Sequence, residues 1–362
     1  MRLLSASVDR FRLALSRSLT TSRGALHERD GFILKLYASS AQCGAGEASP
    51  AYWIDDEQLD DTRASLHRII RAVSDQPDTN DLRVSMLDRD AGLTPAAACA
   101  LDAALLELEA RARHVAVASL LGADQLRAIP VCALLAGDTP AAIASEAARA
   151  INAGYRCLKL KVGAVALEDD VRRVREVRGI AGPQAAIRLD ANRAWSPAQA
   201  RDAMLRFDDF ELEFLEEPLQ RATPDAIAEL RRYSRTPIAL DETIGSPDDL
   251  AKFAECRAAD VVVLKAARLR GVTRATRLGK IALEAGMQVV VTDSIESQVG
   301  MSAAVHLAAA IATPSRGIGL GGLSILAQSV PPPLGAARSS WVRPTAGLGV
   351  ICYSNREIED NA

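Results

Sequence analysis

Two patterns of apolar and polar residues follow one another along the chain. Up to about residue 50 the apolar positions alternate as in β-strands. Ile33-Leu34-Lys35-Leu36-Tyr37 is the clearest example, and Gly44-Ala45-Gly46-Glu47 closes a strand. From about residue 57 to 120 the pattern is helical. One predicted helix has an apolar face of Leu101, Leu105, Leu108 and Ala112, surrounded by Asp102, Glu107, Glu109 and Arg111. Strands followed by helices predict a separate α+β unit.

After about residue 126 short apolar segments alternate with amphipathic helices, at about 25–30 residues per unit. The predicted strands are Ile129–Leu134, Cys157–Val162, Ala186–Asp190, Phe214–Glu216, Ile238–Asp241, Val261–Lys265, Val289–Asp293 and Ile318–Leu320. Eight such units are what a (β/α)8 barrel requires. A doubly wound sheet is the alternative, but it rarely gives eight even repeats, and no G-x-G-x-x-G follows the first strand. We predict an α/β chain in which residues 126–325 form the barrel. An α+β capping domain takes residues 1–125 and is completed by the tail, residues 326–362.

Size and charge narrow the classes of function. The chain has 362 residues, enough for more than one domain, and a net charge of −3 with scattered cations. This charge does not favour nucleic acid or an anionic membrane as a partner. No secretory signal is expected, because Asp9 and Arg10 interrupt the N-terminus, and the alanine-rich stretch Ser297 to Ser315 suits a buried helix better than a membrane span. We expect a cytoplasmic protein that acts on a small molecule, and the sequence leaves a homo-oligomer open.

The cysteines and histidines show no metal-binding or disulfide pattern. The six cysteines form no C-x-x-C pair, and their wide spacing predicts buried, reduced thiols. They are Cys43, Cys99, Cys132, Cys157, Cys256 and Cys352. The four histidines have no ligand spacing either, so zinc is not expected.

Polar residues recur at the carboxyl ends of five consecutive predicted strands, where barrel active sites are assembled. In chain order these are Lys159 and Lys161, Asp190 and Asn192, Glu216, Asp241, and Lys265. Each signal has an ordinary explanation. A K-x-K is usually a solvated strand end, an aspartate there is often a helix N-cap, and Glu-Glu-Pro often starts a loop. Five successive strands with such ends make the ordinary explanation improbable for the set.

The residue types also form a coherent chemical group. Asp190, Glu216 and Asp241 on adjacent strands would repel one another unless a hard divalent cation, Mg²⁺ above all, neutralised them. Lys161 and Lys265 lie on either side of them. Lys159 is a cationic neighbour that would disfavour the charged form of Lys161 and so make it a better base.

The motifs resemble the enolase superfamily, and within it the muconate lactonizing subgroup, from about Ser5 to Val350. The resemblance is carried by Lys159-Leu160-Lys161, Asp190-Ala191-Asn192, Glu216-Glu217-Pro218, Asp241-Glu242-Thr243, Lys265 and the closing Pro344–Val350. It implies a lysine base with Mg²⁺, or Mn²⁺ as the alternative, bound by Asp190, Glu216 and Asp241. It implies that Lys161 and Lys265, with Lys159 beside them, are catalytic on opposite faces of a carboxylate substrate.

The resemblance also implies substrate contacts. Asn192, Ser294 and Glu296 belong to the barrel, and Arg23 and Trp53 belong to loops near Thr20–Gly24 and Ser49–Trp53 that would close over the ligand. Ordinary turns with a partly buried Trp53 explain both loops equally well. Relatives similar to mandelate racemase have a histidine base at the seventh strand, but here that end is Thr292-Asp293-Ser294-Ile295-Glu296-Ser297. We expect His306 to be a core or surface residue.

The subgroup runs several reactions, and the fold does not choose among them. The eighth strand, Gly319-Leu320-Gly321-Gly322, lacks the Asp-x-Asp with which dipeptide epimerases hold an ammonium, and no second lysine follows Lys265 two residues later. These features resemble o-succinylbenzoate synthases, lyases of menaquinone biosynthesis that carry out a syn-dehydration. The alternatives are an N-acylamino acid racemase, a dipeptide epimerase and a muconate cycloisomerase. Arg270-Gly271 departs from the usual Gly-Gly. A non-catalytic barrel is disfavoured, because both lysines and all three carboxylates are present.

Overall fold

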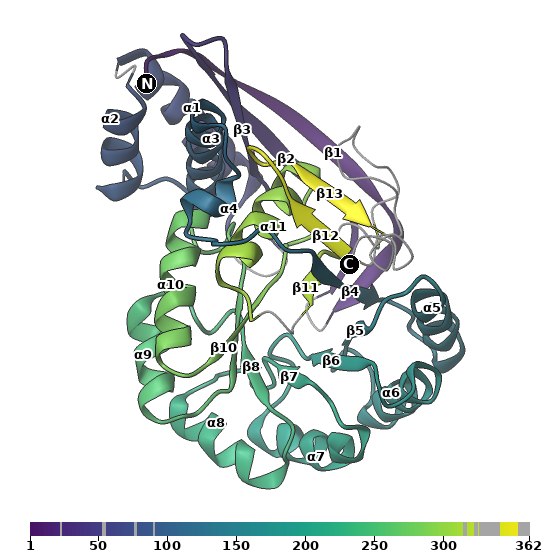
Figure 1. The fold of residues 1–362 in the computed structure, drawn as a ribbon. Coiled ribbons are helices and arrows are strands. Elements are labelled where there is room, and N and C mark those ends of the chain that lie inside the picture. Colours follow the sequence, from purple (N-terminus) through teal and green to yellow (C-terminus); the bar gives the residue numbers. More distant parts are fainter. Residues whose placement is uncertain are drawn as a thin grey trace.

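The protein consists of a small antiparallel sheet with helices beside a closed parallel barrel (Figure 1). The computed structural model describes residues 1–21, 24–52, 56–75, 78–89, 91–313, 317–321, 325 and 341–353. Arg23 and Trp53 lie outside the described residues.

The N-terminal unit is built as the alternating and helical patterns predict. Its sheet has the order β1 (Leu3–Thr21), β2 (Gly24–Ala38) and β3 (Cys43–Ala48). Helices α1 (Leu59–Asp75), α2 (Thr79–Arg83), α3 (Pro95–Arg113) and α4 (Val117–Leu120) follow, with a π-helical turn η1 (Val84–Asp88). Leu34 and Leu36 of β2 are fully buried in one core with Leu66 and Ile69 of α1. The polar residues between them therefore face away from that core.

Helix α3 is buried on both of its long faces, which the sequence did not predict. Leu101 and Leu105 pack in the core of the N-terminal unit, as expected, but Ala103 and Leu106 belong to the barrel core. Ala112, predicted on the apolar face, is exposed near the end of the helix.

Two residues predicted on the polar side of α3 are also buried. Asp102 is 3% exposed and accepts hydrogen bonds from Thr273 N (2.8 Å) and Arg83 Nη1 (2.9 Å). Glu107 is buried and accepts from Ala45 N at 2.6 Å and from Arg111. Asp102 and Glu107 are buried although they surround the predicted apolar face, because the barrel and β3 cover them.

The predicted (β/α)8 barrel is confirmed. Its eight parallel strands are β4 (Ile129–Leu135), β5 (Cys157–Lys161), β6 (Ala186–Asp190), β7 (Phe214–Glu216), β8 (Ile238–Leu240), β9 (Val261–Leu264), β10 (Gln288–Val291) and β11 (Ile318–Gly319). Strands β4 to β10 pair in chain order, and β11 pairs with β4. A bridge between Thr292 and Gly319 links β11 to the end of β10, so the ring closes.

The connecting helices surround the strands. They are α5 (Pro140–Asn152), α6 (Leu167–Ala181), α7 (Pro197–Phe207), α8 (Pro224–Leu230), α9 (Pro247–Glu255), α10 (Val272–Glu284) and α11 (Gln298–Ile311), with 3-10 turns η2 (Asp208–Phe210) and η3 (Arg231–Tyr233). Four of them begin with a serine or threonine N-cap followed by proline, at Thr139, Ser196, Thr223 and Ser246. The capping hydroxyl satisfies an unpaired backbone N–H, and proline suits the first turn, so these dipeptides fix where each helix starts.

The alternation along each barrel strand separates the packing residues from the chemical ones. On β5, Leu158 and Leu160 are fully buried in the core beneath the helices. The residues between them, Lys159 and Lys161, therefore point into the barrel. Below this level Phe214, Ala239, Val261, Val263 and Val290 form a separate small apolar core, and the buried Arg188 guanidinium lies over the Phe214 ring at 5.0 Å. The barrel interior thus has a mainly apolar lower layer with one buried arginine and a charged rim at its carboxyl end.

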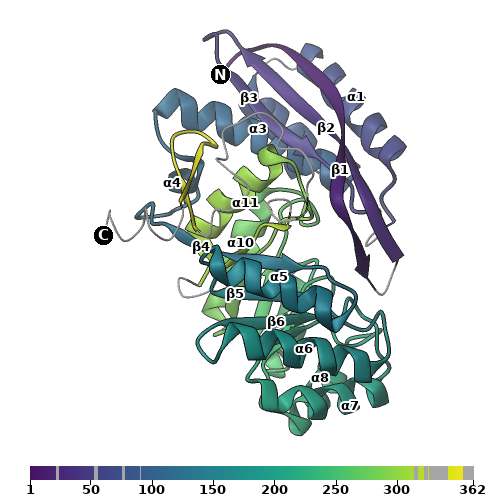
Figure 2. The same cartoon turned by 90° about the vertical axis from the view of Figure 1, so that its right-hand side faces the viewer.

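The long hairpin of β1 and β2 extends from the N-terminal helices to this rim (Figure 2). Leu19 and Leu26, near its tip, form a small buried cluster with Leu134 and Ile295 of the barrel. The N-terminal unit therefore lies over the carboxyl ends of the barrel strands, as a cap must.

The described part of the tail contacts both units. Strand β12 (Trp341–Pro344) pairs with β13 (Val350–Tyr353) and, antiparallel, with β4 of the barrel. Gly347 also bridges to Ala116, next to α4. The predicted domain boundaries stay a prediction.

Helix α11 occupies the stretch in which a buried helix was predicted. No helix in the described part of the chain is both long and apolar enough to cross a membrane. His306 lies fully buried in α11, where Ala118 N donates to its Nδ1 (3.0 Å) and its Nε2 donates to Gly349 O (2.9 Å). This histidine is a core residue that joins the cap, the tail and the barrel.

His306 should make the protein less stable in mild acid. Burial lowers the pKa of His306 to about 4, whereas an unfolded histidine titrates near about 6.5. The unfolded state binds more protons between these values, so stability is lost as pH falls from about 6.5 through about 4, by up to roughly 3 kcal/mol. Urea unfolding near neutral pH and at about pH 4.5 measures this difference. His306→Gln should flatten the pH dependence, the control His67→Gln on the exposed side of α1 should keep it, and an unchanged slope in His306→Gln would contradict the assignment.

Candidate active site

The structure brings the predicted lysines and carboxylates together at one end of the barrel. Lys161, Asp190 and Glu216 are Cα partners across β5, β6 and β7. Asp241 follows β8 directly, and Lys265 follows β9. Strands β5 and β9 are four apart in a ring of eight, so Lys161 and Lys265 enter the rim from opposite sides.

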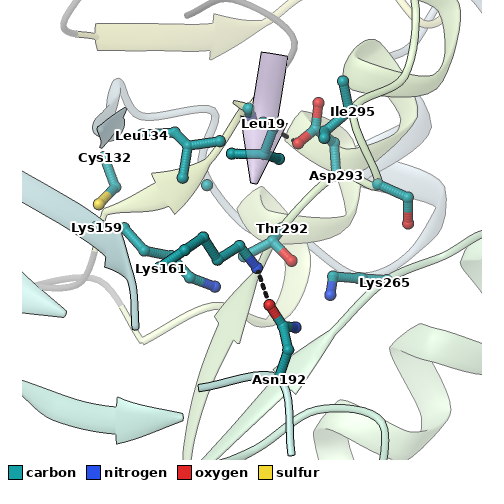
Figure 3. A pocket seen from close by; sticks show the side chains of 13 residues that line it. Leu19, Cys132, Leu134, Lys159, Lys161, Asn192, Lys265, Thr292, Asp293 and Ile295 are labelled. Atoms are coloured by element: carbon teal, nitrogen blue, oxygen red, sulfur yellow. Dashed lines mark hydrogen bonds between the residues drawn. The ribbon is translucent and has the colours of Figure 1, made fainter. Parts of the chain in front are cut away.

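A pocket lies between these two lysines (Figure 3). Its polar wall includes Lys159, Lys161, Asn192, Lys265, Thr292, Asp293 and Ser294. The remaining lining residues are Leu19, Cys132, Leu134, Ile295, Gly319 and Gly321. Leu19 comes from the cap hairpin, so the cap contributes to the wall of the pocket. One side of the pocket is therefore apolar and the other carries ammonium groups.

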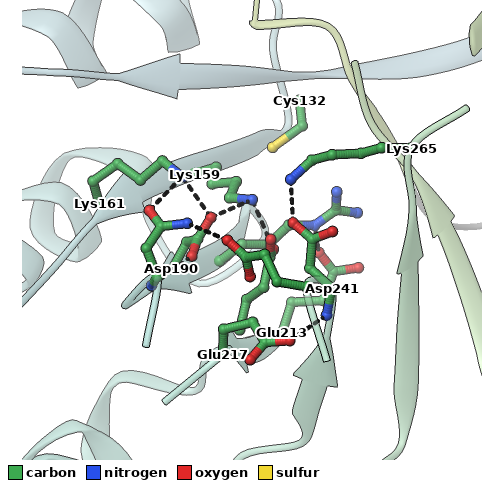
Figure 4. A network of polar contacts seen from close by, with 12 residues as sticks. Cys132, Lys159, Lys161, Asp190, Glu213, Glu217, Asp241 and Lys265 are labelled. Carbon is green, nitrogen blue, oxygen red and sulfur yellow. Dashed lines mark hydrogen bonds and ion pairs between the residues drawn. The ribbon is translucent and has the colours of Figure 1, made fainter. Parts of the chain in front are cut away.

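Ammonium and carboxylate groups alternate beside the pocket (Figure 4). Lys159 Nζ lies 2.8 Å from Asp190 Oδ2 and 2.7 Å from Glu216 Oε2. Lys161 Nζ donates to the same Asp190 oxygen (2.7 Å) and to Asn192 Oδ1 (2.8 Å). Lys265 Nζ donates to Asp241 Oδ2.

Burial and pairing shape the charges of these groups. Burial alone would lower the pKa of Lys159, but Asp190 and Glu216 outweigh it and the pKa is raised. The pKa of Lys265 is likewise raised, because Asp241 and Glu242 outweigh its burial. Burial and the charge of Asp190 raise the pKa of Glu216 to about 8, against the opposing effect of Lys159. The predicted repulsion between Lys159 and Lys161 is offset here, since one Asp190 oxygen contacts both.

The three carboxylates fit a hard cation by their chemistry. They supply only oxygen donors, and Glu216 Oε1 is buried without a hydrogen-bond partner in the part of the chain that is described. The cation that lies between Asp190 and Glu216 in this structure is the Lys159 ammonium group. Among the described residues no three acidic, histidine or cysteine side chains converge as a ready-made metal cluster. Metal binding by Asp190, Glu216 and Asp241 stays a prediction.

Glu217 holds the segment after β8 that carries Asp241. In the sequence this residue stood out only as part of the Glu-Glu-Pro motif. Glu217 is fully buried and accepts from the backbone N–H groups of Asp241 (2.8 Å) and Thr243 (2.7 Å). Burial and Glu242 raise the pKa of Glu217 to about 7, although Arg193 opposes them. Arg268 Nη1, which the sequence did not single out, lies 3.2 Å from Asp241 Oδ1. These contacts fix the position of Asp241.

Asn192 orients Lys161. Its backbone has φ +43°, which asparagine tolerates better than most residues. Its Nδ2 donates to Glu242 Oε1 at 3.1 Å, so the amide is turned with Oδ1 toward the Lys161 ammonium. The structure places Asn192 in the pocket wall next to a lysine, and its contact with a substrate stays a prediction.

Two residues predicted to contact the substrate, Ser294 and Glu296, lie in the segment after β10, and Ser294 is the one that lines the pocket. Ser294 lines the pocket, and its buried Oγ has no hydrogen-bond partner in the described part. Asp293 Oδ1 accepts from Gly321 N at 2.7 Å. Glu296 is buried away from the pocket lining, and burial with Glu47 and Asp293 raises its pKa.

A buried polar network joins this segment to the cap. Arg29 of β2 is 0% exposed and donates to Ile295 O (3.0 Å) and Ser49 O (2.6 Å). Glu47 of β3 accepts from Ser297 N (3.0 Å) and Gly300 N (2.9 Å), at the first turn of α11. Ile295 has φ +58°, a strained value for a branched residue, and its side chain lines the pocket. The cap thereby holds one wall of the pocket in place.

Arg270 does not line the pocket. Its Nη1 donates to Leu93 O of the cap at 3.0 Å, and its φ is +64°. In this structure the residue that replaces the usual glycine therefore reaches the cap.

Comparison with known proteins agrees with this geometry. A family model described as Enolase C-terminal domain-like matches residues 142–350. The hydrophobic dipeptide epimerase of Enterococcus faecalis is 27% identical over 86% of this chain and 88% of its own length. The o-succinylbenzoate synthase of Thermobifida fusca is 40% identical, over 52% of this chain and 58% of its own length.

The fold has close structural neighbours. One is the crystal structure of the E. faecalis dipeptide epimerase in complex with Mg and the dipeptide L-Leu-L-Tyr. It superposes with a TM-score of 0.87 at 24% identity and covers 97% of this chain and 99% of its own. At that identity the likeness establishes the fold.

Proposed function

Because this chain belongs to the enolase superfamily, we propose that it is an enzyme that removes a proton from the carbon next to a substrate carboxylate. Mg²⁺, or Mn²⁺ in its place, would be held by Asp190, Glu216 and Asp241. The observation that carries the proposal is the placement of Lys161 and Lys265 on opposite sides of one pocket, with these carboxylates beside it.

The residues divide the chemistry between them. Bound Mg²⁺ would supply positive charge to the substrate carboxylate and so favour loss of the neighbouring proton. Lys161, in its neutral form, takes the α-proton, and Asn192 orients its amine. Lys265 stays protonated, as its raised pKa favours, and offsets the negative charge that develops on the other face.

For the specific reaction we propose a syn-dehydration that gives o-succinylbenzoate, a lyase step of menaquinone biosynthesis. In that reaction Lys161 returns its proton to the departing hydroxyl on the same face. The apolar side of the pocket, formed by Leu19, Leu134 and Ile295, suits the carbon ring of such a substrate. Asp293 also lines the pocket, and its two oxygens accept from Gly321 N (2.7 Å) and Glu296 N (3.4 Å).

A racemase or epimerase of the same superfamily is the second candidate. It is favoured by the two lysines on opposite faces, since inversion at a carbon needs a proton carrier on each side. The E. faecalis relative, which aligns along most of its own length, is a dipeptide epimerase. The experiment that separates the candidates is a substrate panel in D2O, monitored for elimination and for deuterium exchange. Elimination from the hydroxylated precursor of o-succinylbenzoate supports the lyase, and exchange without elimination supports the second candidate.

Loss of the metal should remove activity under either candidate. Asp241→Asn should lower kcat/KM by roughly a thousandfold and weaken Mg²⁺ binding, because one anionic oxygen ligand is lost. Activity assays after chelation and Mg²⁺ addition, with calorimetric titration of Mg²⁺, measure both effects. Asp225→Asn, on the exposed side of α8, is the matched control and should change neither. Wild-type Mg²⁺ affinity in the Asp241→Asn protein would contradict the assignment of this ligand.

A further inference from the structure

Two cysteines that are distant in sequence meet at the inner wall of the pocket. Cys132 of β4 and Cys157 of β5 are Cα partners in the parallel ladder. Their side chains point to the same face, and the two Sγ atoms lie 2.7 Å apart. Neighbouring strands run about 4.8 Å apart, which is within the Cα separation that a disulfide spans, about 4.4–6.8 Å. The pair is free in this structure and needs no movement of the strands to form a bond.

Of the two cysteines, Cys132 lines the pocket and Cys157 does not. Cys132 lines the pocket, on the side where Lys159 points in (Figure 3). Cys157 is not among the lining residues, and its Sγ lies 3.8 Å from Glu213 Oε2. Both residues are buried, Cys132 2% and Cys157 6% exposed, and Cys132 is the member of the pair that a reagent in the pocket meets.

A buried cation lies next to the two thiols. Arg188 is 1% exposed, and it donates through Nε to Glu213 (2.5 Å) and through Nη1 to Gly317 O (2.8 Å). Its Nη2 has no hydrogen-bond partner among the described residues. A positive charge beside a thiol favours the thiolate, which is the reactive form.

The two thiols differ in their expected protonation. Burial raises the pKa of Cys132, but the hydrogen bond from Cys157 and the charge of Arg188 outweigh it, so the pKa lies below its usual value. Burial and the same hydrogen bond raise the pKa of Cys157 well above that value. The hydrogen bond from Cys157 and the charge of Arg188 therefore favour Cys132 as the member of the pair that loses its proton first.

We propose that Cys132 and Cys157 form a reversible thiol-oxidation site, at which a small hydroperoxide that enters the pocket is reduced and the pair becomes a disulfide. The Cys132 thiolate attacks one peroxide oxygen, so that an S–O bond forms, the O–O bond breaks and hydroxide leaves to become water. The Cys157 sulfur then attacks the sulfenic sulfur, an S–S bond forms, and a second water leaves with the Cys157 proton. Two thiols and one hydrogen peroxide thus give one disulfide and two waters.

Cys157 makes the oxidation of Cys132 reversible. Without Cys157, oxidised Cys132 would proceed to irreversible oxides or hold an adduct in the pocket beside Lys159. With Cys157 in contact, the oxidation stops at a bond between β4 and β5 that a dithiol can reduce. This role does not depend on which reaction the pocket catalyses.

The test is peptide mapping of the whole, pre-reduced protein after treatment with hydrogen peroxide and alkylation of the remaining thiols. Wild type should give a Cys132–Cys157 linked peptide that dithiothreitol removes. Cys157→Ser should instead give Cys132 sulfenic acid, trapped as a dimedone adduct about tenfold faster than any adduct at Cys99. Cys99→Ser, a buried cysteine on α3 without a neighbouring thiol in the described part, is the matched control and should form the disulfide as wild type does.

Two outcomes would overturn the proposal. One is wild-type protein that keeps both thiols free under peroxide treatment that fully oxidises the exposed Cys256. The other is a folded Cys157→Ser protein with no dimedone adduct at Cys132. If the serine variant does not fold, Cys157→Ala and the wild-type peptide map decide the same question.

Discussion

The Lys161→Ala protein loses α-proton exchange, and its kcat/KM falls by at least roughly a thousandfold, if Lys161 is the base of the proposed reaction. The loss is expected on every substrate of the panel, because both candidate reactions begin with removal of the same kind of proton. Deuterium incorporation followed by NMR, together with steady-state kinetics, measures it.

The geometry favours Lys161 over Lys159 as the base. Lys159 Nζ lies between the carboxylates of Asp190 and Glu216, and its raised pKa keeps it charged. Lys161 has the neutral Asn192 amide as one of its two partners. Its other partner is the Asp190 oxygen that it shares with Lys159, so one neutral and one anionic group orient the amine.

A structural explanation of the Lys161 loss can be separated from a catalytic one. The Lys161→Ala protein should keep its Mg²⁺ affinity, since the three proposed carboxylate ligands are unchanged. Its thermal unfolding midpoint should stay within a few degrees, since Lys159 still pairs with Asp190. Lys252→Ala, on the exposed surface of α9, is the matched control and should keep full activity. Persistent exchange in a folded Lys161→Ala protein would exclude Lys161 as the base.

The barrel and its charged rim could be predicted because their signals are local in the sequence. Five consecutive strands end within one or two residues of a polar side chain, and parallel strands bring their carboxyl ends to one edge. That is why Lys161, Asp190 and Glu216 could be placed in one site before the structure showed them in register.

The parts that sequence analysis missed depend on contacts between distant segments. Arg29 holds the carbonyl of Ile295 from the cap, and Glu47 caps α11, yet nothing near either residue marks a partner so far along the chain. The burial of Asp102 likewise depends on a segment distant in the sequence. A charged residue on a helix predicts a solvated face, but a second unit covers that face here.

The contact between Cys132 and Cys157 could not be predicted from the sequence either. The wide spacing of the cysteines predicted buried, reduced thiols and indicated no pair, because two cysteines on neighbouring parallel strands are separated by a whole βα unit. Only the register of β4 and β5 brings Cys132 and Cys157 together. The prediction of buried thiols was wrong for Cys256, which is exposed.

Lys265→Arg should separate the two candidate reactions. Arginine keeps the positive charge but does not act as a base near neutral pH. In a syn-dehydratase Lys265 only offsets charge, so elimination should survive with a loss of about tenfold to a hundredfold from altered geometry. In a racemase Lys265 carries a proton, so exchange of the enantiomer whose proton faces Lys265 should vanish while the other enantiomer still exchanges.

The measurement is deuterium exchange of both enantiomers of an N-succinylamino acid, beside elimination from the hydroxylated precursor of o-succinylbenzoate. Lys265→Met serves as the paired variant, because it removes both the charge and the proton and should abolish either reaction. Rapid exchange of both enantiomers by wild type, with loss of only one in Lys265→Arg, would establish the racemase and refute dehydration as the main activity. Retained elimination in Lys265→Arg with none in Lys265→Met would show that Lys265 acts through its charge, which is the role that its contact with Asp241 and its raised pKa favour.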